Sequence, residues 1–155
     1  NQHEFDNGNL GLTALNIADA KCNLTFVEAL TRGIYCNALV CLAVWLCYSC
    51  RSTTDRILAI IFPITAFVAA GFEHCVANMY FVPAGLAIKT WAGENYWLNA
   101  GMSAEGFANL SWSRFFLVNL LPVTIGNVIG GAGFVAILYW SVYCRNRPNE
   151  PQPKE

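Results

Sequence analysis

The chain has 155 residues, of which 55% are apolar and only 12% are charged, and its mean hydropathy is +0.40. This composition is too apolar for an ordinary soluble domain and matches the membrane class. The formal net charge of −1 argues against recognition of nucleic acid or an acidic partner through bulk charge. Because the sequence does not begin with Met, we expect it to be a piece of a longer chain.

The first apolar segment covers about residues 24–50 and is long enough to span a bilayer. Residues 1–23, which precede it, are polar and acidic, and we expect them to form a segment outside the membrane. The apolar segment begins with an amphipathic stretch in which Glu28 and Arg32 are four residues apart. At this spacing the two side chains can pair on one face of a helix.

The second apolar segment, about residues 57–88, has the wrong length for one straight span. A helix of this length would measure roughly 48 Å, against about 30 Å of hydrocarbon. Gly71 lies near its middle and is followed closely by Glu73 and His74. Ionisable residues in a membrane segment cost about 2.5–3.5 kcal/mol each on insertion scales, so they usually face a cavity or a partner. The sequence therefore predicts a broken helix with the break near Gly71.

The third apolar segment covers about residues 115–144 and can also span the bilayer. Gly126 and Gly130 form the G-x-x-x-G pattern that allows close helix contact in lipid, so we interpret them as packing residues. Asn127 lies on the same turn and is a polar residue in an apolar run. It either hydrogen-bonds across helices or lines a pore, and spacing alone does not separate these alternatives.

The connections between the segments predict their orientation. The turn at residues 51–56 and the tail at residues 145–155 both carry arginines, and three spans put them on the same side. The positive-inside bias predicts that this side is cytoplasmic, with the tail disordered. Residues 1–23 and the loop at residues 89–114 then lie outside. The expected protein is a multi-pass integral protein of the plasma (inner) membrane.

Polar residues on or near the spans suggest a pathway for anions. Lys21 would raise the local anion concentration at an outer mouth, while Asn37 and His74 would line a narrow centre. A broken helix also exposes N–H groups that favour anions, and histidine can exchange a proton near neutral pH. We expect Glu73 to be a structural acceptor that holds the break, because neighbouring helical residues differ by about 100° in direction. The alternative is a buried, fully hydrogen-bonded polar cluster without a pathway.

The residues give no sign of catalysis, of a metal or of a cofactor. Cys47 and Cys50 form a Cys-x-x-Cys pair, but no second pair and no nearby histidine completes a zinc site. A haem anchor commonly needs two axial histidines from spans, and His3 lies in a polar segment far from His74. No catalytic triad, phosphate loop or H-E-x-x-H motif occurs. We therefore expect a protein that is not an enzyme.

Three stretches resemble, in the same order, the signatures of the formate/nitrite transporter family: residues 32–45, 71–79 and 124–131. The resemblance covers about residues 21–144 and is strongest to formate channels. It implies an all-α membrane protein that assembles as a homopentamer, with a pore in each aquaporin-like protomer. Such a protomer has six spans arranged as two inverted three-helix repeats. This chain resembles the second repeat alone, with a channel half at residues 24–144, and would need the missing first repeat of its own chain.

The resemblance also implies roles for particular residues. The central histidine of the family falls on His74, its pore asparagine on Asn37 and its vestibule lysine on Lys21. Phe67 and Val40 match residues that line a hydrophobic constriction.

The function implied by the resemblance is passage of formate and related small monovalent weak-acid anions. Protonation near His74 would convert formate to neutral formic acid and lower the cost of entering an apolar constriction, so we expect proton-linked or pH-gated permeation. Asn127 matches a pore-side asparagine of the last span of the family. Transport of nitrite, hydrosulfide or lactate by the same fold is an alternative. A structural or anchor subunit of a membrane enzyme complex is another.

Overall fold

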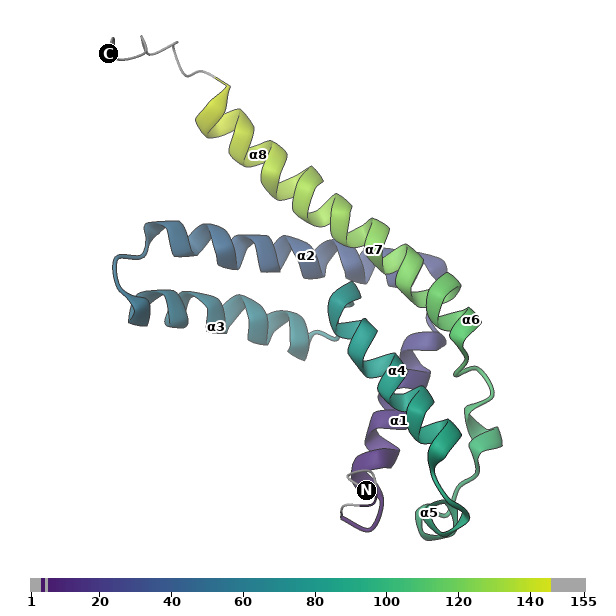
Figure 1. Ribbon diagram of the computed structural model, residues 1–155. Helices are drawn as coiled ribbons and strands as arrows, with labels where there is room; N and C mark the ends of the chain where they lie inside the picture. The colour runs from purple at the N-terminus through teal and green to yellow at the C-terminus, as the bar shows by residue number, and fades with distance from the viewer. Residues whose placement is uncertain (1–3, 5, 146–155) are drawn as a thin grey trace, which may run out of the picture.

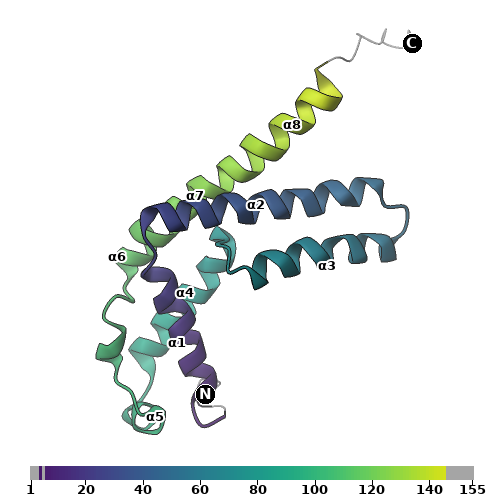
Figure 2. The ribbon, with the colours of Figure 1, turned by 180° about the vertical axis from the view of Figure 1, so that it is seen from behind.

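The computed structural model describes residue 4 and residues 6–145, and within these residues the chain is helical and contains no strand (Figure 1). The tail predicted at residues 145–155 lies, apart from its first residue, outside the described residues. The helices form two antiparallel pairs that a long C-terminal rod crosses. One of these pairs consists of α2 (Phe26–Ser49) and α3 (Thr53–Ala69), which also lie side by side in the view from behind (Figure 2).

The N-terminal segment is a helix that contributes to the core. Its residues form α1 (Asn9–Cys22), which packs along α4 (Cys75–Trp91). The two helices approach closely at Gly85, where an added Cβ would collide with the side chain of Ala18. The core between these helices and the following loop is apolar and consists of Leu15, Ala18, Cys22, Val82, Leu86, Tyr96, Phe107, Leu110 and Phe115.

The loop predicted at residues 89–114 is compact and holds two short helices, α5 (Glu94–Ala100) and η2 (Ala104–Phe107). Lys89 falls in the last turn of α4 and fastens this loop. Its ammonium donates to the carbonyl oxygens of Phe107 at 2.7 Å and Leu110 at 2.9 Å. The lysine thus satisfies backbone acceptors of the loop that would otherwise need water.

α2 begins at a capping box that uses Glu28, which the sequence predicted to pair with Arg32. The Thr25 hydroxyl accepts a hydrogen bond from the Glu28 amide at 3.3 Å, and the Thr25 amide donates to Glu28 Oε2 at 2.9 Å. This reciprocal arrangement satisfies two N–H groups at the helix start. The predicted pairing of Glu28 with Arg32 is wrong as a direct contact, since no ion pair between them occurs among the described residues.

The helix break expected near Gly71 is confirmed. α3 ends at Ala69 and α4 begins at Cys75, with His74 as its N-cap. Gly71 adopts φ +65°, a left-handed conformation that glycine tolerates and other residues rarely adopt. The helical course is therefore interrupted here, so that peptide groups between the two helices need partners from elsewhere.

The third apolar segment is one continuous rod from Trp112 to Cys144, in which α-helical and wider π-helical turns alternate. Its parts in order are α6 (Trp112–Arg114), η3 (Phe115–Leu120), α7 (Leu121–Val128), η4 (Ile129–Ala136), α8 (Ile137–Tyr139) and η5 (Trp140–Cys144). Within the described residues, two helices are long and apolar enough to cross a membrane, Phe26–Ser49 and Ala104–Cys144. The second predicted span is divided between α3 and α4, which have 17 residues each.

Glycines allow the rod to lie directly on the backbone of α2. A Cβ added to Gly126 would collide with the carbonyl oxygen of Leu30, and one added to Gly130 would collide with that of Ile34. The interpretation of Gly126 and Gly130 as packing residues is therefore confirmed. Close backbone approach of this kind is the usual source of helix association in lipid, where burial of apolar surface supplies no driving force.

We expect Gly130→Ala to lower the free energy of unfolding by about 1–3 kcal/mol, because the new methyl group has only rigid backbone to displace. The matched control is Gly133→Ala, where the added Cβ would lie an ordinary 3.8 Å from the Ile129 side chain. Thermal unfolding of both variants in detergent is the measurement. Equal melting temperatures for the two variants would contradict the packing role of Gly130.

Candidate functional site

A hollow of about 590 Å³ lies where α1, the start of α2 and the broken α3–α4 pair meet. α1 contributes Lys21 and α2 contributes Arg32. Phe67 comes from the last turn of α3, and Glu73 and His74 come from the break itself. The structure thus brings together four of the predicted site residues, Lys21, Phe67, Glu73 and His74, although they are up to 53 positions apart in sequence.

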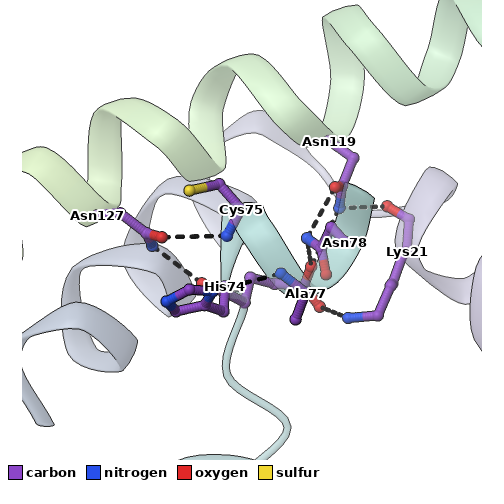
Figure 3. Close-up of polar contacts among 8 residues, drawn as sticks. Lys21, His74, Cys75, Ala77, Asn78, Asn119 and Asn127 are labelled. Atoms are coloured by element: carbon purple, nitrogen blue, oxygen red, sulfur yellow. Dashed lines mark hydrogen bonds and ion pairs between the residues drawn. The ribbon is translucent and has the colours of Figure 1, made fainter. Parts of the chain in front are cut away.

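The Glu73 carboxylate is the centre of a polar network beside the hollow. Figure 3 shows other members of this network, Lys21, Asn78 and Asn119. The Glu73 side chain is buried, and Oε1 accepts from the Lys21 ammonium at 2.8 Å. Oε2 accepts from the side-chain amides of Asn78 at 2.6 Å and Asn119 at 3.1 Å. Burial of an ion pair is favourable only when further hydrogen bonds satisfy the remaining lone pairs, and the two asparagines meet this requirement.

Two members of the network, Asn78 and Asn119, were not predicted as site residues. Both side chains are fully buried, and Asn119 Oδ1 accepts from Asn78 Nδ2 at 2.8 Å. Asn119 Nδ2 also donates to the carbonyl oxygen of Lys21 at 3.0 Å, which ties the rod to the end of α1. Asn78 Oδ1 has no hydrogen-bond partner among the described residues. The sequence did hold a signal for these two asparagines, because a side-chain amide in an apolar segment is costly unless it is hydrogen-bonded.

Asn127 holds the break to α2 and does not line the hollow. Its side chain is buried, Oδ1 accepts from the Cys75 amide at 3.1 Å, and Nδ2 donates to the carbonyl oxygens of Gly33 at 2.9 Å and Glu73 at 3.0 Å. Both amide hydrogens are therefore used. Figure 3 shows the bond that the Asn127 side chain accepts from the Cys75 amide. Spacing left two alternatives open for Asn127, a pore lining and hydrogen bonds across helices. In the structure of this chain, its side chain forms hydrogen bonds across helices.

Asn37 and Val40 lie on α2 outside the set of residues that line the hollow. Asn37 Nδ2 donates to the backbone carbonyl of Asn127 at 2.6 Å, so this side chain also joins α2 to the rod. Val40 is partly buried and follows almost one helical turn later. The structure of this chain does not bring either residue to the hollow.

His74 caps α4 with one ring nitrogen. Nδ1 accepts from the Ala77 amide at 3.4 Å, which in the neutral imidazole assigns the hydrogen to Nε2. No described residue forms a hydrogen bond with Nε2. The ring is partly buried, and its centroid lies 6.2 Å from that of Phe67 across the hollow wall. One nitrogen thus fixes the ring, while the Nε2–H group remains able to donate a hydrogen bond to a molecule in the hollow.

A family model described as "Formate/nitrite transporter" matches residues 2–141 of the chain. Formate channel FocB of Escherichia coli (strain K12) is 46% identical over 143 residues, which are 92% of this chain and 51% of the relative. Formate channel FocA of the same strain is 45% identical over 139 residues, 90% of this chain and 49% of the relative. The chain therefore spans about half the length of these curated relatives.

A solved structure described as "Pentameric formate channel with formate bound" has the same fold. It superposes with a TM-score of 0.88 at 45% sequence identity, covering 92% of this chain and 56% of that one. The chain and this solved structure are therefore similar in sequence as well as in fold.

We expect the Lys21–Glu73 pair to be strongly coupled. Glu73→Gln leaves the Lys21 ammonium without its partner, and loss of one member of a buried ion pair costs about 3–5 kcal/mol. Lys21→Met should be similarly destabilising, and the double variant should be less destabilised than the sum of the two. Thermal unfolding of the three variants measures the coupling, with exposed Glu94→Gln as control. Additive effects, within about 0.5 kcal/mol, would contradict it.

Asn127→Leu should destabilise the protein by removing one acceptor and two donors from buried backbone groups. Each polar group left without a partner costs about 1–3 kcal/mol. The exposed Asn99→Leu makes the same chemical change without burial and is the control. Thermal unfolding in detergent compares the two variants. Similar stability of both would mean that the Asn127 bonds do not hold the break.

Proposed function

Because this chain belongs to the formate/nitrite transporter family, we propose that it forms about half of a membrane channel for formate and related small monovalent weak-acid anions. The observation that carries this proposal is the hollow at the helix break, where Lys21, Phe67 and His74 meet in a chain about 45% identical to formate channels. The similar curated proteins are channels or transporters rather than enzymes.

The surfaces of the helices support a membrane environment for the chain. Large apolar side chains are exposed along α2, α3 and the rod, among them Tyr48 at 76%, Phe62 at 75% and Leu117 at 66%. Apolar surface of this extent needs lipid or protein to cover it. We propose that the channel half, residues 24–144, lies in the plasma (inner) membrane with its C-terminal end cytoplasmic, on the strength of the arginines at that end.

We propose further that the complete protein is a homopentamer of aquaporin-like protomers, each with six spans in two inverted repeats. Two observations support this proposal. The similar solved structure is described as pentameric, and the chain corresponds to about half of the curated relatives. The remaining half would then cover the open side of the hollow and complete the pore.

In the proposed mechanism, His74 first binds a second proton from the solvent; as an imidazolium it donates its Nε2 proton to the carboxylate of the permeating anion and returns to the neutral imidazole. Formate that accepts a proton at its carboxylate becomes neutral formic acid, which crosses an apolar constriction at much lower cost than the ion. Phe67 and Val40 form this constriction, and Asn37 lines the path next to it. The Nε2–H group of His74 supports the transfer, because no described residue accepts from it while Nδ1 holds the ring at the helix start.

Glu73 and Asn127 act by holding the break, so that His74 keeps its orientation. Both have their polar side-chain atoms engaged by neighbouring residues, which supports a structural role. We therefore assign Asn127 to the support of the pathway and not to its lining. Nitrite is a second candidate substrate, because the matching family model is described by both anions.

The test is formate uptake into proteoliposomes that contain the complete protein, at about pH 5.5 and about pH 7.5, which bracket the ordinary titration of histidine. We expect wild-type uptake to be faster at the lower pH, and His74→Asn to reduce uptake at both values and to remove most of this difference. Asparagine is a good N-cap, so α4 should still form.

Protein-free liposomes correct for formic acid that crosses the lipid unaided, and assembly of the variant is verified by its mass in detergent. Unchanged uptake by His74→Asn would make His74 purely structural. If the wild type carries no formate, parallel assays with nitrite, hydrosulfide and lactate determine which anion the fold conducts.

A further inference from the structure

The positive charge of Lys21 is largely cancelled where it lies. Its ammonium is 2.8 Å from Glu73 Oε1, and it also lies over the ring of Phe81, 5.8 Å from the ring centroid. Opposite charges at this separation act at longer range as a dipole, whose field falls off faster than that of a single charge. Lys21 can still donate a hydrogen bond to an anion inside the hollow, but it attracts anions from a distance only weakly.

Arg32 is the other permanent cation that lines the hollow. The acidic residue nearest to it on α2, Glu28, uses its carboxylate in the capping box with Thr25. Among the described residues, none forms a hydrogen bond or ion pair with the Arg32 guanidinium. The contact that Arg32 makes with the break runs through its backbone, since its carbonyl oxygen accepts from the Glu73 amide at 3.4 Å.

We propose that Arg32 is the residue that recruits anions to the hollow. With Lys21 held in an ion pair by Glu73, Arg32 is the cation of this lining that forms no ion pair with a described residue. A guanidinium is always protonated and presents planar donors that fit a carboxylate or a nitrite-like anion. Arg32 thus binds the incoming monovalent oxyanion first, and Lys21 and His74 receive it from there. This inference rests on the proposed function and assigns its recruitment step to a residue.

The experiment measures initial formate uptake by the complete protein in proteoliposomes for wild type, Arg32→Gln, Arg32→Lys and the control Arg56→Gln. Arg56 is an exposed arginine near the start of α3 that does not line the hollow. Each variant is assayed over a range of formate concentrations at about 0.01 M and about 0.15 M ionic strength, where the Debye length is roughly 30 Å and 8 Å.

Arg32→Gln should raise the half-saturating formate concentration about three- to tenfold at low ionic strength and leave the maximal rate within about twofold, because loss of one focusing charge affects capture more than passage. Uptake at low formate should fall with added salt in wild type and in Arg56→Gln, and should be insensitive to salt in Arg32→Gln. Arg32→Lys should retain most of the effect. Equal half-saturation and equal salt dependence for Arg32→Gln and Arg56→Gln would overturn the proposal.

An equilibrium measurement separates this inference from the proposed function. Broadening of the chloride NMR signal by the protein in detergent, and its reversal by added formate, report anion binding whether or not the protein transports. A wild type that conducts no anion contradicts the proposed function alone. If the broadening is then weaker in Arg32→Gln than in Arg56→Gln, the Arg32 site stands, and if it is the same in both, the Arg32 site is overturned.

Discussion

The site depends on how the peptide groups at the helix break are satisfied. Breaking a helix in an apolar surrounding leaves N–H and C=O groups without partners, and each costs free energy until a partner is found. Here the partners are side chains from another part of the chain. Asn127 engages the Glu73 carbonyl and the Cys75 amide, while the carboxylate of Glu73 is held by Lys21, Asn78 and Asn119. His74 is therefore fixed by its two chain neighbours.

The polar residues around the break fall into two groups with different roles. Glu73, Asn119 and Asn127 have their side chains surrounded by protein and engaged by several partners. His74 and Arg32 keep polar side-chain atoms at the hollow that no described residue engages. Residues of the first group maintain geometry, and those of the second group are able to contact a molecule in the hollow. A polar residue in an apolar segment is thus a site candidate only after its partners are known.

Length and composition were enough to locate the three apolar segments and the break, because a run too long for one span and a glycine beside a charged pair leave few arrangements open; they did not indicate the helix at Asn9–Cys22. The close contact at Gly126 and Gly130 also followed from spacing, since small residues four apart share one helix face. The position of Asn127 could not be derived in the same way. Its neighbours come from α2 and from the break, and pairing across distant segments is invisible to local periodicity. Spacing predicted that Arg32 pairs with Glu28, whereas in the structure the Glu28 carboxylate accepts hydrogen bonds from Thr25 in the capping box.

The order of the chain has a consequence for biogenesis. The break at Gly71–His74 is completed by Asn119 and Asn127, which follow it by more than forty residues. During synthesis α3 and α4 therefore exist for some time before their stabilising partners have been made. In that interval the Glu73 amide already has the carbonyl oxygen of Arg32, but the Glu73 carbonyl and the Cys75 amide still lack Asn127. The break therefore gains its full set of partners only after the rod has been made, so that the rod completes the fold of the α3–α4 pair.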